Sequence, residues 1–141
     1  MSPSAAAGRV AAQVATVGFI TFIGIQAGLA LGLIPVTMAW GGTQATLTPS
    51  LRVASVVAAL VLAGCAVTVR TRAGLTRFRV SRGVRIAAFV ITAYLALNVV
   101  GNLTSPSDAE RLLFGPLSAV LVIACGVVAS ARLEETPLQT P

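Results

Sequence analysis

Four long runs of apolar residues alternate with short polar segments along the chain. The runs cover residues 10–33, 51–69, 86–103 and 112–131. An α-helix rises about 1.5 Å per residue and the hydrocarbon core is about 30 Å thick, so runs of this length can cross a bilayer. The alternation of a membrane β-barrel is missing, and helices are the other fold that satisfies the backbone in lipid. The pattern predicts an all-α, polytopic four-transmembrane-helix bundle that forms one domain over residues 1–141.

Composition agrees with a membrane location. Hydrophobic residues make up 56% of the chain and charged residues only 10%, whereas soluble domains carry about 25% charged residues. The net charge is +6, and every basic residue is an arginine. Because the chain has no lysine and is rich in alanine, valine and glycine, we expect a bacterial source with a GC-rich genome. The expected location is therefore the bacterial cytoplasmic (inner) membrane.

The arginines are distributed unevenly between the two sides of the predicted bundle. Six lie in the basic loop 70–85, and Arg9 and Arg132 flank the outermost helices on the same side. Only Arg52 and Arg111 lie on the other side. The positive-inside rule then places both termini and the basic loop in the cytoplasm. We expect this loop to bind anionic lipid, at about 1 kcal/mol per basic residue. Nucleic-acid binding is not expected, because no recognition motif accompanies the charge.

Polar residues gather on the opposite, outward side. The candidate site residues are Trp40, Gln44, Arg52, Asn98, Asn102 and Glu110. One interpretation is an outward-facing polar pocket for a small ligand, because ionisable groups at a membrane boundary are functional candidates. The other is a structural cluster in which Arg52 pairs with Glu110 or Asp108 and Trp40 anchors in the interface. Glu110 is the better partner because it lies closer to the fourth helix.

The first apolar run contains a GxxxGxxxG series formed by Gly24, Gly28 and Gly32. Residues four apart share one helical face, and glycine there lets a second backbone approach closely. The series predicts either tight packing against another helix of the same bundle or the interface of a homo-oligomer.

The chain lacks the side chains that most catalytic sites need. It has no histidine, and no acidic residue lies within the four apolar runs. Paired carboxylates, a Ser-His-Asp set and a phosphate-binding loop are missing as well. We therefore expect no enzyme activity, no cofactor and no metal. The expected function is a binding or accessory membrane protein, and the alternative is a small oligomeric channel or facilitator for a small solute.

Several short motifs carry a resemblance. They are Trp40-Gly41-Gly42, Leu47-Thr48 with Arg52-Val53-Ala54-Ser55, and Gly101-Asn102 with Glu110 and Phe114-Gly115-Pro116. In this pattern the chain resembles a group of small uncharacterised bacterial four-helix integral membrane proteins, over residues 28–130. The resemblance implies the same fold and outward-facing residues as the shared feature, and it implies no activity.

Overall fold

The structure is a computed structural model that describes residues 3–131, and every regular element within that range is a helix. The long helices are α1 (Pro3–Leu31), α2 (Pro49–Arg72), α3 (Arg82–Thr104) and α4 (Gly115–Ser130), with the π-helical turn η3 (Glu110–Phe114) directly before α4. Two 3-10 turns, η1 (Val36–Met38) and η2 (Trp40–Gly42), lie between α1 and α2. With η3 and α4 taken together, four helices are long and apolar enough to span a membrane. The predicted four-helix membrane fold is thus confirmed, and the protein is a multi-pass membrane protein.

The helices extend beyond the apolar runs at most of their ends. α1 begins at Pro3, and α2 includes Arg70 and Arg72, so the predicted basic loop 70–85 shortens to residues 73–81. Arginines in the last turn of a helix interact favourably with its dipole, and their long side chains can reach the membrane surface. α3 starts early because the Ser81 hydroxyl accepts a hydrogen bond from the amide of Val84 at 3.3 Å. Arg132 and the tail after it lie outside the described residues.

α1 ends two residues earlier than predicted because Gly32 adopts a left-handed conformation, with φ of +76°. The amide of Leu33 then donates to the carbonyl of Gly28 at 2.8 Å, as in a Schellman motif. This turn directs the chain away from the helix axis into the long segment 32–48.

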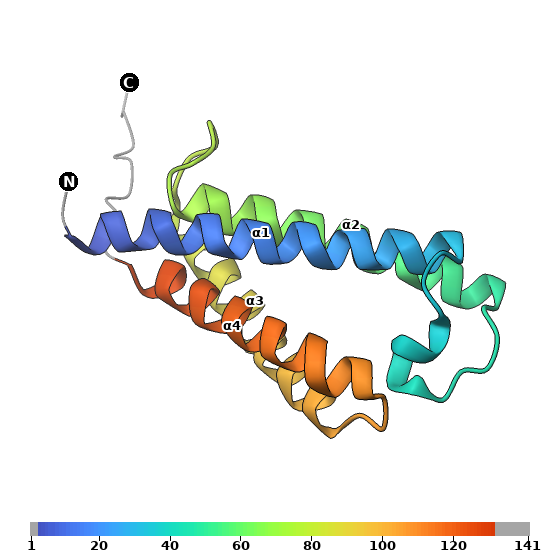
Figure 1. Ribbon diagram of the computed structural model, residues 1–141. Helices are drawn as coiled ribbons and strands as arrows, with labels where there is room; N and C mark the ends of the chain where they lie inside the picture. Colours follow the sequence, from blue (N-terminus) through green and yellow to red (C-terminus); the bar gives the residue numbers. More distant parts are fainter. Residues whose placement is uncertain (1–2, 132–141) are drawn as a thin grey trace.

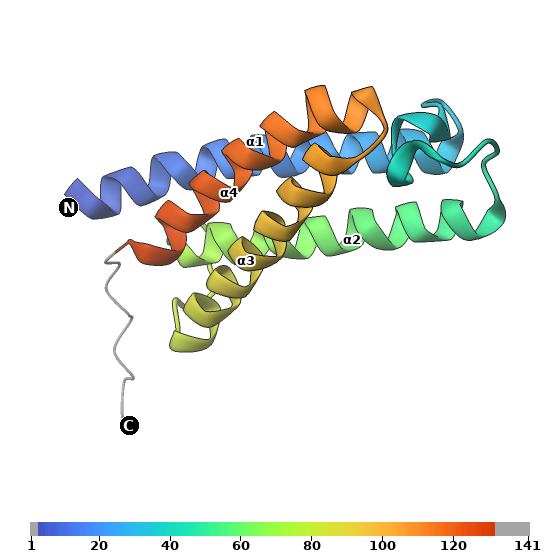
Figure 2. The same cartoon turned by 90° about the horizontal axis from the view of Figure 1, so that it is seen from below.

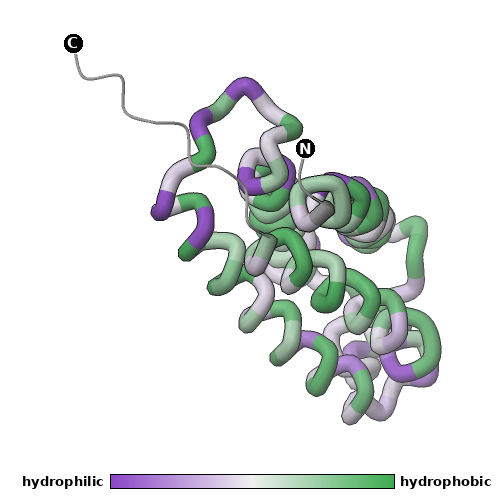
Figure 3. The backbone as a smooth tube through the Cα atoms, turned by 90° about the vertical axis from the view of Figure 1, so that its left-hand side faces the viewer, coloured by the Kyte–Doolittle hydropathy of each residue, from purple (hydrophilic) through white to green (hydrophobic). Residues whose placement is uncertain are grey.

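The four helices form two hairpins that converge at one end. Both ends of the described chain and the loop 73–81 lie together at what we call the basic end, and segments 32–48 and 105–109 lie at the opposite, Trp40 end. Figure 1 shows the α3–α4 pair diverging from the α1–α2 pair toward the Trp40 end. In Figure 2, α3 crosses α2, and at the Trp40 end α3 and α4 both lie away from α2. Figure 3, which looks at the basic end, shows hydrophobic residues along the helices and hydrophilic residues gathered in the connecting loops.

The hydrophobic core occupies the half of the bundle nearer the basic end. Its buried residues are Ala12, Ala15, Phe19, Val69, Ala73, Leu95, Leu121, Ala124, Cys125 and Val128. α1 and α4 approach closely here: a Cβ added to Gly18 would lie only 3.1 Å from Cδ1 of Leu121. Small residues therefore bring the two helices together, as is typical of membrane bundles.

The GxxxGxxxG series does not take part in this contact. A Cβ on Gly24 would meet nothing within 4 Å, and one on Gly28 would meet the side chain of Ile34 at 2.7 Å, in the segment that follows the same helix. Gly32 ends α1. An added Cβ on Gly32 would lie 3.6 Å from Nη2 of Arg52 on α2. The prediction of packing against another helix of the same chain therefore fails at the exposed Gly24, while the nearest side chain to the buried Gly28 is that of Ile34. The alternative, the interface of a homo-oligomer, stays a prediction.

Candidate functional site

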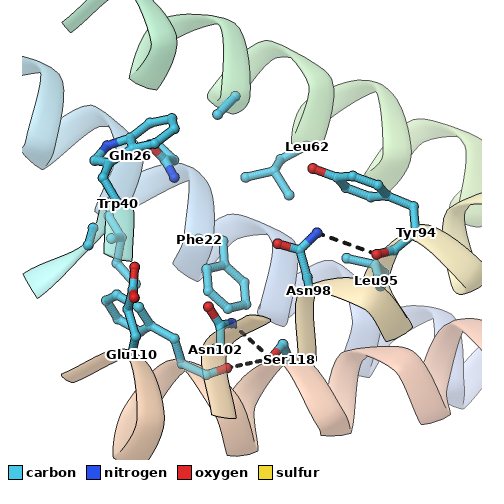
Figure 4. A pocket seen from close by; sticks show the side chains of 14 residues that line it. Phe22, Gln26, Trp40, Leu62, Tyr94, Leu95, Asn98, Asn102, Glu110 and Ser118 are labelled. Atoms are coloured by element: carbon cyan, nitrogen blue, oxygen red, sulfur yellow. Dashed lines mark hydrogen bonds between the residues drawn. The ribbon is translucent and has the colours of Figure 1, made fainter. Parts of the chain in front are cut away.

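A cavity of about 240 Å³ lies between the diverging hairpins, on the Trp40 side of the core. All four helices and the segment between α1 and α2 contribute to its wall. The lining residues are Phe22, Ile25, Gln26, Ala39, Trp40, Ala58, Leu62, Tyr94, Leu95, Asn98, Asn102, Glu110, Phe114 and Ser118. Figure 4 shows amide and carboxyl groups directed between aromatic and aliphatic side chains. Such a mixed lining is typical of a small-molecule site.

Glu110 holds two segments of the Trp40 end together. The residue is only 8% exposed. Oε1 accepts a hydrogen bond from the amide of Gly41 at 3.0 Å, and Oε2 accepts one from the hydroxyl of Ser105. The Ser105 oxygen in turn accepts from the amide of Ser107. The two carboxyl oxygens therefore connect the segment around η2 with the start of η3.

Ser107 makes a second connection between the same two segments. Its hydroxyl donates to the carbonyl of Thr37 at 3.3 Å. A Cβ on Gly42 would lie 2.7 Å from Cβ of Ser107 and 3.2 Å from its backbone nitrogen, and Gly42 has φ of +67°. Only glycine meets both demands, because it has no Cβ and tolerates the left-handed region. The segment with η1 and η2 is thus fixed against the start of η3.

Trp40 occupies a strained backbone position. Its φ is +56°, and it is the one residue other than glycine with positive φ among the described residues. Bulky residues rarely adopt this conformation, which costs about 1–3 kcal/mol and tends to occur at functional sites. In this conformation Trp40 lines the cavity, and the residue remains 36% exposed.

The π-helical turn η3 places two further lining residues, Glu110 and Phe114. Pro116 follows this turn, and a proline inside a helix removes one hydrogen bond and clashes with the carbonyl four residues earlier. The turn widens so that the amide of Gly115 donates to the carbonyl of Glu110, five residues back. The sequence suggests that Pro116 lies in the first turns of its helix, but helical structure already begins at Asp108. The π turn is the consequence, and such turns are frequent at functional sites.

Hydrogen bonds orient the two asparagine side chains of α3. The Asn102 amide donates to the Ser118 hydroxyl at 3.2 Å, and that hydroxyl donates to the carbonyl of Phe114 or Gly115. The Ser118 hydroxyl has one proton and donates it to a backbone carbonyl, so it can only accept from Asn102. The group of Asn102 that faces Ser118 is therefore its amide nitrogen, and its oxygen is directed toward the cavity. The Asn98 amide likewise donates to a backbone carbonyl of its own helix. Figure 4 shows both oxygens turned toward the cavity.

The structure brings together four of the six predicted site residues: Trp40, Asn98, Asn102 and Glu110. Gln44 is exposed and does not line the cavity. Arg52 does not line it either, and it does not pair with Glu110 or Asp108. Its Nη1 donates to the carbonyl of Ala30 at 2.8 Å, at the end of α1. The predicted Arg52–Glu110 pair is therefore wrong.

The reason for this difference is the direction of the Arg52 side chain. Side chains in a helix point toward its N-terminus, and Arg52 lies in the first turn of α2, beside the free carbonyl groups of α1. A guanidinium group at a helix C-terminus is stabilised by hydrogen bonds and by the dipole. Among the described residues, the ion pair at this end is instead Arg111–Asp108, in the first turn of the helix that continues through η3.

Several lining residues lay outside the sequence prediction. Phe22, Gln26, Tyr94, Phe114 and Ser118 all occur inside apolar runs. The signal that could have found Gln26 is its polarity in an otherwise apolar stretch, because polar groups in a span usually face the protein interior. Its Oε1 is buried and has no hydrogen-bond partner.

Comparison with family models, with curated proteins and with solved structures gave no match. We therefore infer the chemistry of the site from its lining residues alone. Within residues 3–131, no group of three or more His, Cys, Asp or Glu side chains could hold a metal ion. The cavity offers one carboxylate, three amide side chains and an aromatic wall, which suits reversible binding.

Proposed function

We propose that this protein is a non-enzymatic binding or accessory membrane protein that holds a small polar molecule in the cavity. The observation that supports this most is the combination of a buried carboxylate and inward amide oxygens with aromatic walls, drawn from all four helices. A purely structural polar cluster would satisfy its own groups, as Arg111 and Asp108 do. Here Gln26 Oε1 stays without a partner at the edge of an open volume.

The cavity is closed toward the basic end, which favours binding over passage through a single chain. Phe19 and Leu121 are fully buried in the core between the cavity and that end, and Leu95 belongs to both the core and the cavity wall. The alternative function, an oligomeric channel or facilitator, would need a path between chains. The exposed face of α1 around Gly24 would offer such an interface.

Trp40 allows a direct test of binding, because it is the only tryptophan of the chain. The purified protein in lipid nanodiscs is titrated with three panels of small solutes: cations, anions and neutral polar molecules. We expect saturable changes of Trp40 emission with one panel, together with a raised unfolding temperature, since a ligand that binds the folded state stabilises it. If no panel changes either quantity, the proposal is wrong.

We further propose that the Trp40 end faces the outside of a bacterial cytoplasmic membrane. The arginine bias supports this orientation. Single cysteines at Thr46 and Ser81, on a background with Cys65 and Cys125 replaced by alanine, test it in intact cells. The cysteine at position 46 should react with an impermeant thiol reagent and the one at position 81 should not. The reverse labelling pattern would refute the orientation.

We also propose that the basic end binds anionic lipid. Arg77, Arg82 and Arg85 are exposed there beside the exposed Phe78, whereas Arg72 is buried and donates to the carbonyl of Ala131 at 2.6 Å. Replacing Arg77 by glutamine should reduce the amount of phosphatidylglycerol that copurifies, as measured by mass spectrometry. Arg111→Gln, at the Trp40 end, is the matched control. Equal lipid retention in both variants would contradict this proposal.

A further inference from the structure

The cavity contains a single charged side chain, and it is negative. Among the described residues that line the cavity, Glu110 is the only Asp, Glu, Lys, Arg or His side chain. A buried charge is costly unless a counter-charge or several hydrogen bonds offset it. Glu110 has hydrogen bonds from Gly41 and Ser105, and within residues 3–131 it forms no ion pair. The two arginines of this end are held elsewhere, Arg52 on α1 and Arg111 on Asp108.

Several of the polar groups that remain for a ligand are hydrogen-bond acceptors. Asn98 and Asn102 each use one amide N–H within the protein, and their oxygens are directed toward the cavity. Oε1 of Gln26 is buried without a donor. Each Glu110 oxygen keeps a lone pair after its one protein donor. Carbonyl and carboxylate oxygens need N–H or O–H groups, so the missing partner is a donor.

Aromatic rings complete the wall on the side of α1 and η3. Phe22 and Phe114 pack edge to face, with ring centroids 6.0 Å apart, and the Trp40 indole lies above Glu110 in Figure 4. The faces of such rings attract cations, most strongly when water is excluded. An anion would meet both the carboxylate and the negative ring faces.

From these three observations we infer that the cavity binds a small protonated amine, a primary or secondary alkylammonium ion. This inference rests on the proposed binding function and names its ligand class. The ammonium group lies against Glu110 and the amide oxygens, and its alkyl part contacts the rings. The cavity volume is about 240 Å³, which suits a small molecule, so the ligand is a short alkylamine.

The test uses propylammonium chloride at neutral pH with the full chain in nanodiscs of zwitterionic lipid. Binding is followed by Trp40 emission and by calorimetry. We expect saturation with propylammonium and none with 1-propanol, which has the same chain length but no charge. Tetramethylammonium, which has a charge but no N–H group, should bind at least about tenfold more weakly, because hydrogen bonds between charged groups contribute most.

Two matched variants locate the charge. Glu110→Gln keeps an acceptor for the Gly41 amide and removes the negative charge, and it should weaken propylammonium binding at least about tenfold. Asp108→Asn removes the same charge from the neighbouring exposed carboxylate and should leave binding unchanged. Both variants should unfold at similar temperatures. If Glu110→Gln fails to fold, Asn98→Ala, which removes one acceptor from a half-exposed position, should still weaken binding severalfold.

The outcomes separate this inference from the proposed function. Saturable binding of anions or neutral solutes without alkylammonium would overturn the inference and keep a binding protein. Equal binding by wild type and Glu110→Gln, or displacement of propylammonium by an equal concentration of sodium ions, would also overturn it. A response to no solute at all would reject both.

Discussion

The two halves of this bundle are held together by different means. Toward the basic end, Ala12, Ala15 and Leu121 belong to a fully apolar core. Toward the Trp40 end, the hairpins diverge. The contacts between them include the edge-to-face pair of Phe22 and Phe114, the Glu110 carboxylate, the Ser107 hydroxyl and the left-handed residues of η2. The same four helices thus provide a packed anchor at one end and a cavity at the other.

This difference indicates where function can reside in a chain of this size. In a bilayer the hydrophobic effect adds little between helices, so close packing of small residues must supply the stability. The closely packed half at the basic end can therefore stabilise the fold, while the half at the Trp40 end is packed less closely. The buried Glu110 carboxylate, the cavity with polar lining and the strained backbone of Trp40 all occur in that second half.

The largest expected effect comes from overpacking the anchored half. Replacing Gly18 by leucine forces the new side chain into Leu121, which is 1% exposed and lies 3.1 Å from the position of the added Cβ. We expect a loss of about 3 kcal/mol in unfolding free energy, at the upper end for overpacking. Unfolding in detergent, followed by circular dichroism, measures it.

Gly24→Leu is the matched control on the same helix. Nothing lies within 4 Å of its added Cβ, so we expect a change within about 0.5 kcal/mol, as at most surface positions. If Gly24→Leu instead lowers the oligomer mass in detergent, this face is the interface of a homo-oligomer. Equal destabilisation by both leucines would show that the two faces are packed alike.

A smaller effect is expected at the docked segment of the Trp40 end. Gly42→Ala places a Cβ 2.7 Å from Ser107 in a left-handed conformation, whereas Gly41→Ala has similar φ, +78°, and open space. Left-handed backbone costs about 1–2 kcal/mol in either variant. The additional loss in Gly42→Ala then measures the loop contact, and we expect about 1 kcal/mol more. Indistinguishable melting temperatures would show that the two loops separate at no cost.

The smallest effect concerns Arg52. Because this exposed side chain makes one hydrogen bond to Ala30, Arg52→Ala should destabilise the protein by about 1 kcal/mol. It contacts no cavity residue, so its effect and that of Glu110→Ala should add to within about 0.5 kcal/mol. A coupling energy well above that value in the double-mutant cycle would restore the ion pair that the structure contradicts.

The membrane spans could be predicted from the sequence, and their ends could not. Hydropathy identifies about twenty apolar residues in a row, which is a strong signal. The ends of the helices depend on single residues, which a hydropathy average over many residues does not resolve. Ser81 caps α3, Arg72 extends α2, and Gly32 stops α1 in a left-handed turn.

The candidate site was predictable to the extent that it is polar. Trp40, Asn98, Asn102 and Glu110 stand out in an apolar chain, whereas Phe22 and Phe114 look like any other membrane residue. Pairing charges by topology failed because it ignored side-chain direction and the free carbonyl groups at the end of α1, which Arg52 satisfies. The pattern of polar and apolar residues along the sequence shows neither the direction of a side chain nor the carbonyl groups near it.

The divergence of the hairpins also has a consequence for the surrounding bilayer. A bundle that is narrow at the basic end and wide at the Trp40 end displaces fewer lipids from one leaflet than from the other (Figure 1). Lateral tension and spontaneous curvature therefore act on the opening angle between the α1–α2 and α3–α4 pairs. Because the cavity lies within that angle, a change of the angle would change the cavity volume. We therefore expect the lipid composition of the wider leaflet to influence that volume.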